Sequence, residues 1–182
     1  MNLTDLGWDS VFEAAFARLD APNARPARVA REDKGAYLVL SEFGELRGRV
    51  SGRLHHETRS GSELPAVGDW VAVKARPEQG EATICAVLPR RSCLARNAST
   101  GKAEKTEEQA LAANVDTAFL VTGLDGNFNV RRIERYVTVA WESGASPVVV
   151  LNKADLCDDL DARVSEVESV ACGVPVLSLI HI

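Results

Sequence analysis

The sequence predicts two structural parts, a small β-barrel followed by an α/β domain with a parallel sheet. Five short strand patterns with glycine turns between about residues 25 and 95 indicate the barrel. After residue 113 strand patterns alternate with helix patterns, which is typical of a parallel sheet with helices on both faces. A chain of 182 residues can hold one large domain or two small ones.

Residues 1–24 are expected to form a helical segment ahead of the barrel. Apolar residues recur at helical spacing, which gives the helix one apolar face. These residues are Trp8, Val11, Phe12, Ala15, Phe16 and Leu19. The stretch "APNARP" then ends the helix, because it contains two prolines.

The barrel is expected over residues 25–95. Gly35 and Gly44 mark tight turns between the first three strands. The OB-fold is the commonest small barrel with this pattern, and an SH3-like barrel is the alternative. The predicted strands cover residues 27–31, 36–41, 46–54, 67–75 and 82–89.

The barrel segment is basic although the whole chain carries a net charge of −5. Residues 25–100 hold 13 basic and 9 acidic residues, a net of +4, which could meet a polyanion or could be an ordinary solvated surface. Tyr37, Phe43 and Trp70 could stack on bases, but aromatic residues within strands usually pack inward. The candidates for RNA phosphate contacts are Lys34, Arg47, Arg49, Arg53 and Arg59.

Residues 96–112 are polar and without periodicity, and we predict a linker there. The pair Gly101–Lys102 invites comparison with a phosphate-binding loop, G-x-x-x-x-G-K-[ST]. Arg96 stands where the first glycine belongs, and Ala103 stands where the hydroxyl residue belongs. The comparison fails at two of the four fixed positions, so this stretch is not predicted to hold phosphates.

Residues 113–182 are expected to form the α/β part. Strands are predicted over 115–121, 147–151 and 174–177, with helices over 129–144 and 158–173. Asn129 is a suitable N-cap for the first helix, and Gly144 is a suitable stop. The buried stripe of that helix is predicted to contain Val130, Ile133, Val137, Ala140 and Trp141.

The stretch "SPVVVLNKADL" places Asn152, Lys153, Ala154 and Asp155 directly after a strand. Ligands of open parallel sheets bind at this end of the strands. An ionised Asp155 can accept hydrogen bonds from both N1–H and the N2 amino group of guanine, a pair that adenine lacks. Asn152 can bridge the O6/N7 edge, and the stem of Lys153 can lie across the ring. The alternative is that Asp155 only caps a helix.

Other features of the chain exclude several classes of protein. No apolar run reaches the 18 or so residues of a membrane span, and no secretory signal is recognisable. The four cysteines form no Cys-x-x-Cys pair, so no metal site is predicted and a reducing cytoplasm is expected.

Several long segments resemble one family, the ribosome small-subunit-dependent GTPases of the RsgA type. These segments are "ELPAVGDWVAV", "VLPRRSCLAR" and the stretch from "LAANVDTAFLV" to "VLNKADL". The resemblance implies an N-terminal OB-fold and a circularly permuted P-loop-type GTPase domain, in which Asn152, Lys153 and Asp155 match the guanine-specificity motif. It also implies late maturation of the small ribosomal subunit as the function, rRNA contact through the OB-fold, and a monomer without a membrane partner. Its cofactors would be GTP or GDP with Mg²⁺, with zinc in a C-terminal domain.

The chain departs from this pattern because no G-x-x-x-x-G-K-[ST] or D-x-x-G motif occurs in it, and the zinc ligands are absent. We therefore expect a truncated member that binds GTP weakly and does not hydrolyse it, with no catalytic residue in this chain. The alternative is a non-catalytic OB-fold RNA-binding module with a remnant guanine-reading half-domain.

Overall fold

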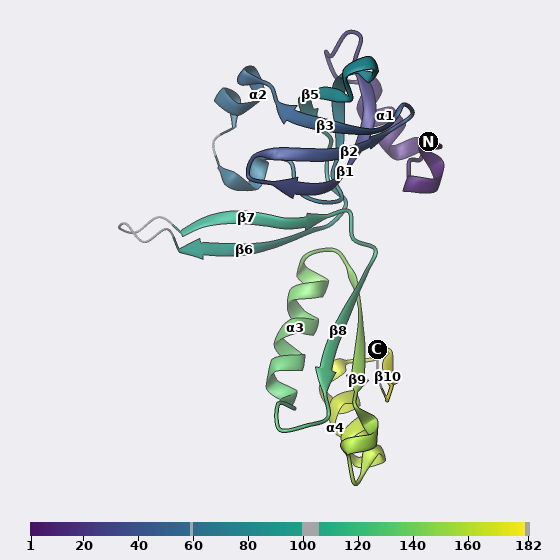
Figure 1. Cartoon of the computed structure of the whole chain (residues 1–182). Coiled ribbons are helices and arrows are strands. Elements are labelled where there is room, and N and C mark those ends of the chain that lie inside the picture. The colour runs from purple at the N-terminus through teal and green to yellow at the C-terminus, as the bar shows by residue number, and fades with distance from the viewer. Residues whose placement is uncertain (59, 100–105, 181–182) are drawn as a thin grey trace. The chain divides into compact units, whose positions relative to one another are not determined.

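The computed structural model describes residues 1–58, 60–99 and 106–180 (Figure 1). The chain divides into two compact units, Met1–Asn114 and Val115–Ile182.

The first unit contains a closed five-stranded barrel with the strand order β1-β2-β3-β5-β4, and β4 pairs with β1 to close it. Among the described strands of the barrel, β3 and β5 pair in parallel and the other pairs are antiparallel, and α2 lies between β3 and β4 in the chain. This arrangement confirms the predicted OB-type barrel. The elements are β1 (Arg25–Asp33), β2 (Ala36–Ser41), β3 (Gly44–Val50), α2 (Gly52–Glu57), η2 (Gly61–Glu63), β4 (Trp70–Arg76), η3 (Pro77–Gln79) and β5 (Glu81–Val87).

The barrel forms because alternate residues of its strands are apolar and point inward. In β2, Tyr37 and Val39 are buried while their neighbours are partly exposed. Gly48 of β3 is needed for close packing, because a Cβ there would lie 3.3 Å from Ile84 and Val39 side-chain atoms. Val71 and Val73 of β4 complete the buried cluster.

The third predicted strand was too long. β3 ends at Val50 instead of residue 54, because the hydroxyl of Ser51 accepts a hydrogen bond from the Leu54 amide and starts α2. The N-terminal helical segment contains η1 (Thr4–Leu6) and α1 (Ser10–Ala17). Phe12 lies on the apolar face of α1 as expected and packs with Trp70, but Val11 is 61% exposed and does not belong to that face.

The predicted linker over residues 96–112 is wrong. β6 (Cys93–Ser99) and β7 (Thr106–Ala113) form an antiparallel ladder, with Cys93 opposite Ala113. The sequence did not suggest a strand because "TEEQALAA" is rich in Glu and Ala, which are depleted in strands. Gly101 and Lys102 lie outside the described residues.

The second unit contains a three-stranded parallel sheet in the order β10-β9-β8. Asn129 caps α3 by accepting a hydrogen bond from the Arg132 amide, as predicted, whereas Trp141 is 55% exposed and lies outside the buried stripe. The elements are β8 (Thr117–Gly123), α3 (Val130–Glu142), β9 (Ser146–Asn152), η4 (Ala154–Leu156), α4 (Leu160–Ala171) and β10 (Val176–Ser178).

Both helices of this unit pack on the same face of the sheet. Val137 of α3 and Val167 of α4 share one apolar cluster with Val149 of β9. The prediction of helices on both faces is wrong for the described residues, because two right-handed crossovers in one direction place both helices on one side. On β8, Phe119 is 63% exposed and Val121 is 53% exposed.

An ion pair holds the loop before β4 against the segment that follows β5. Both carboxylate oxygens of the fully buried Asp69 accept hydrogen bonds from Arg90, at 2.6 and 2.8 Å. Arg90 also donates to the carbonyl oxygens of Ser62 and Leu64. The Arg90 guanidinium therefore provides hydrogen-bond donors for two carbonyl oxygens of the loop before β4.

The substitution Arg90→Met should lower the free energy of unfolding of the barrel unit by about 3–5 kcal/mol, because it leaves a buried carboxylate unpaired. Urea denaturation followed by tryptophan fluorescence would measure this loss. Arg53→Met is the matched control, because Arg53 pairs with Glu57 at an exposed position. Equal stability of the two variants would show that the buried pair does not hold the loop.

Candidate functional site

The candidate site lies where β8 and β9 end. The two strands are parallel and Gly123 is in register with Asn152, so the loops that follow them meet at one edge of the sheet. The Leu124 amide donates to the Asn152 carbonyl oxygen at 2.8 Å and ties the two loops together.

An ion pair joins the two loops at this edge. Lys153 Nζ lies 2.6 Å from Asp125 Oδ2, and Asp125 Oδ1 accepts a hydrogen bond from the Asn127 amide at 3.0 Å. The ammonium of Lys153, followed by the Asn127 amide, lowers the pKa of Asp125 below its ordinary value of 3.8. Asp125 in turn raises the pKa of Lys153, with a smaller contribution from Asp155. Sequence reasoning missed Asp125, which lies 28 positions before its partner.

The four predicted residues differ in their surroundings. Lys153 has a φ of +61°, a left-handed conformation that is uncommon for residues other than glycine. Ala154 and Asp155 belong to the short helix η4, and Asp155 is exposed. Asn152 Oδ1 is buried and has no hydrogen-bond partner among the atoms that the structure describes. A buried acceptor of this kind is costly unless another group donates to it.

This geometry can present one carboxylate to a ligand. Among the hydrogen bonds and ion pairs of residues 1–58, 60–99 and 106–180, none ends on the Asp155 carboxylate. Asp125 is already engaged by Lys153, so the two acids differ in what they can accept. An exposed carboxylate at the end of a parallel strand suits a ligand with two adjacent N–H donors.

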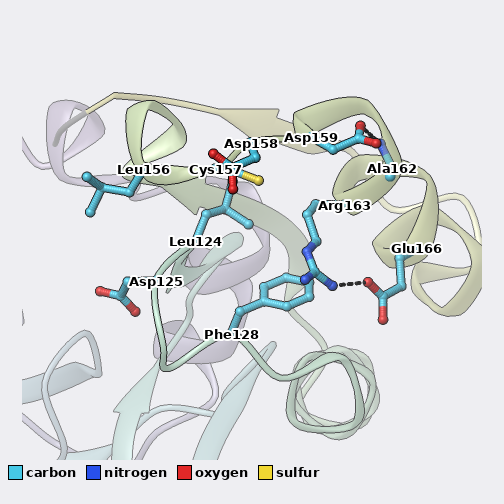
Figure 2. A pocket seen from close by; sticks show the side chains of 10 residues that line it. All are labelled: Leu124, Asp125, Phe128, Leu156, Cys157, Asp158, Asp159, Ala162, Arg163 and Glu166. Carbon is cyan, nitrogen blue, oxygen red and sulfur yellow. Dashed lines mark hydrogen bonds and ion pairs between the residues drawn. The ribbon is translucent and has the colours of Figure 1, made fainter.

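A pocket of about 340 Å³ lies beside these residues and contains a stacked arginine (Figure 2). The guanidinium of Arg163 lies 5.0 Å from the centre of the Phe128 ring and pairs with Glu166 at 2.8 Å. Because four acidic side chains line the pocket, it should repel phosphate groups. Its lining consists of Leu124, Asp125, Phe128, Leu156, Cys157, Asp158, Asp159, Ala162, Arg163 and Glu166.

Three of the five RNA candidates come together on the barrel. Lys34, Arg47 and Arg49 are exposed and line one groove of about 770 Å³ with His55 and Tyr37. Arg47 and Arg49 alternate along β3 with the buried residues Leu46 and Gly48, so both arginine side chains point out of the barrel. Burial, followed by Glu32 and Asp69, raises the pKa of Tyr37 to about 12, so its hydroxyl stays neutral.

The other candidates do not join this groove. Arg53 lines a different hollow, which includes Lys74, and its Nε donates to Glu57 at 2.8 Å. Arg59 lies outside the described residues. Tyr37 and Trp70 are buried, as their positions in strands suggested, whereas Phe43 is 48% exposed.

The described residues contain no group of three or more His, Cys, Asp or Glu side chains that could hold a metal ion. Zinc takes three or four protein ligands of these types, so the described residues do not supply a zinc site. In the part of the chain that the structure describes, no helix is both long and apolar enough to cross a membrane.

Comparison with known proteins gives a family and several relatives. The RsgA GTPase family model matches residues 87–181, just over half of the chain. "Small ribosomal subunit biogenesis GTPase RsgA" of Opitutus terrae is 51% identical over 98% of this chain and 50% of its own length. The protein of the same name from Syntrophotalea carbinolica is 44% identical over 97% of this chain and 49% of its own. The chain thus spans about half the length of these relatives.

Two solved structures share the fold. YjeQ from Thermotoga maritima aligns with a TM-score of 0.64 at 24% identity, over 86% of this chain and 51% of its own. YloQ, described as a circularly permuted GTPase, aligns with a TM-score of 0.62 at 20% identity, over 88% of this chain and 53% of its own.

The substitution Lys153→Met should raise the pKa of Asp125 toward 3.8, because Lys153 is the largest cause of its lowering. Carboxyl ¹³C NMR of the chain during an acid titration would measure this. The ion pair stabilises the folded chain above pH 3.8, and its contribution should be lost as the pH falls through the lowered pKa. An unchanged Asp125 titration in Lys153→Met would mean that the pair does not form in solution.

Proposed function

The chain belongs to the RsgA GTPase family, and on that premise we propose that it carries the guanine-reading and RNA-contacting parts of a GTPase for small ribosomal subunit biogenesis. The observation that carries the proposal is the position of Asn152–Asp155 at the end of β9, with an exposed carboxylate and a buried acceptor that has no partner among the described residues. Both features suit a base-binding loop better than a simple helix cap.

Asp155 is the group that would distinguish guanine from adenine. Its two oxygens accept from N1–H and the N2 amino group, and adenine has no such pair of donors. Asn152 would line the O6/N7 edge or support the neighbouring loop, and the Lys153 stem would cover one face of the ring. Because this part of the nucleotide carries no phosphate, the acidic pocket beside Asp125 does not oppose it.

The remaining functions are proposed for the whole protein of this family. We propose that it binds GTP and GDP and hydrolyses GTP with Mg²⁺, that a further domain binds zinc, and that it works as a cytoplasmic monomer on the small subunit. Phosphate binding supplies much of the affinity in such enzymes. At about 0.3 kcal/mol per non-hydrogen atom, the base alone would gain about 3 kcal/mol, which corresponds to a Kd of several millimolar.

The barrel groove would supply the RNA contact. Lys34, Arg47 and Arg49 place three positive charges in a groove that Glu32 and Asp33 also line. Because Asp33 pairs with Arg31, the basic residues still outnumber the unpaired acids, and oligonucleotides commonly bind to OB-fold surfaces. This groove also favours the second candidate function, a non-catalytic RNA-binding module. The guanine-reading function predicts a preference for GMP over AMP, whereas a non-catalytic RNA-binding module predicts similar binding of both.

In ¹H–¹⁵N NMR titrations of the 182-residue chain, GMP at millimolar concentration should shift the amides of Asn152–Asp155, and AMP should not. Asp155→Asn should weaken GMP binding at least about tenfold, because a charged acceptor is lost. The same variant should gain affinity for XMP, since an amide can donate to the C2 carbonyl of xanthine.

Asp161→Asn is the control for the loss of one negative charge, because Asp161 lies in the first turn of α4 and not in the motif. Equal responses to GMP and AMP in the unmodified chain would reject guanine reading. They would leave the RNA-binding module as the better description.

The double charge reversal Arg47→Glu with Arg49→Glu should weaken binding of a single-stranded oligouridine of about 12 nucleotides. The dependence of log K on log salt should become shallower by about 1.4, because each lost phosphate contact removes about 0.7 for a single strand. Fluorescence anisotropy over a range of salt concentrations would measure both effects.

Arg53→Glu with Lys74→Glu is the matched control, because it changes the net charge equally but lies in a different hollow. If both double variants lose affinity equally, the effect comes from net charge, and the groove is not the binding surface.

A further inference from the structure

We propose that Asp125 is a positioning residue for guanine recognition, which holds the ammonium of Lys153 away from Asp155 and leaves that carboxylate free for the base. The inference rests on the proposed function of Asn152–Asp155 and adds a residue outside that motif. Asp125 itself would not contact the nucleotide.

Two carboxylates flank Lys153: Asp125 on the neighbouring loop, and Asp155 two residues further along the chain. Its Nζ is bound to Asp125 Oδ2 at 2.6 Å, yet Asp155 also contributes to the electrostatic surroundings of Lys153. An ammonium bound to Asp155 would occupy lone pairs that guanine needs and would neutralise the charge that strengthens those hydrogen bonds. The two acids therefore compete for one cation, and selectivity depends on which acid binds it.

The structure favours Asp125 in this competition. Its second oxygen is fixed by the Asn127 amide at 3.0 Å, and the Phe128 amide donates to its carbonyl oxygen at 3.0 Å. The carboxylate is therefore held in place before Lys153 binds, so little entropy is lost when the pair forms. Asp155 lies exposed in η4, and no hydrogen bond to its side chain occurs among the described residues.

The backbone on both sides of the pair suits this arrangement. Lys153 adopts a left-handed conformation at the end of β9, and the hydrogen bond from the Leu124 amide to Asn152 keeps the two loops adjacent. Gly123 leaves room for the Asp125 carboxylate, because a Cβ at that position would lie 3.1 Å from Asp125 Oδ2. The loop after β8 thus binds the ammonium, so the four-carbon stem of Lys153 connects the end of β9 to that loop.

The substitution Asp125→Asn separates this role from a purely structural one. An asparagine keeps the side-chain oxygen that accepts from the Asn127 amide, so the turn is preserved while the charge that binds Lys153 is lost. Asp116→Asn is the control, because Asp116 is an exposed acid that precedes the opposite end of β8. Both variants change the net charge by the same amount.

The test is a double-mutant cycle on GMP binding to the 182-residue chain, measured by NMR titration. Asp125→Asn should weaken GMP binding about three- to tenfold, and Asp116→Asn should not change it. In a Lys153→Met background Asp125→Asn should have no further effect, because no ammonium remains to compete for Asp155. In the nucleotide-free chain at neutral pH, Asp125→Asn should also move the Asp155 carboxyl ¹³C resonance, and Lys153→Met should reverse that shift.

Two results would overturn the inference while guanine reading stands. One is a preference for GMP over AMP that Asp125→Asn leaves intact, and the other is an equal loss of affinity with and without Lys153. The inference would also fail if Asp125→Asn left the Asp155 carboxyl ¹³C chemical shift unchanged, because the ammonium would then not move to Asp155. If the unmodified chain does not prefer GMP over AMP, the proposed function fails, and the role of Asp125 fails with it.

Discussion

The parallel pairing of β8 with β9 is the constraint on which the candidate site depends. Because Gly123 is in register with Asn152, the loops that follow the two strands must leave the sheet at the same edge. Asp125 and Lys153 are 28 positions apart in the sequence, yet they form an ion pair of 2.6 Å. The hydrogen bond between Leu124 and Asn152 fixes the spacing of the loops, and the side chains then determine which acid is neutralised and which stays free.

The barrel unit shows a different use of a charged pair. Asp69 is fully buried, and Arg90 bonds both of its oxygens as well as two loop carbonyl oxygens, so this pair organises backbone. The exposed charges on β3 have no such structural task. Arg47 and Arg49 point away from a core formed by Val39, Val71 and other apolar residues, and they are available to a polyanion. In the function proposed above, the buried arginine of this barrel serves stability, and the exposed arginines would serve RNA contact.

An element could be predicted from the sequence when its local residue pattern matched the surroundings it has in the fold. β2 has the expected bounds, because its residues alternate between inside and outside and glycines flank it. Asn129 could be identified as a helix N-cap because neighbouring residues mark it, and the same local reading gives Asn152–Asp155 as the proposed base-binding loop. The β6–β7 hairpin was missed because its residue types are poor strand formers. Asp125 was missed because only the tertiary pairing of two strands brings it to Lys153, and no local pattern marks it.

The left-handed conformation of Lys153 affects which substitutions this position tolerates. A lysine in the left-handed conformation costs about 1 kcal/mol relative to glycine, so glycine would relieve this backbone strain at the end of β9. It would also remove the ammonium that engages Asp125 and the stem on which a base could lie. Relief of backbone strain alone would therefore favour glycine, whereas the proposed base binding and the ion pair with Asp125 would favour the strained lysine.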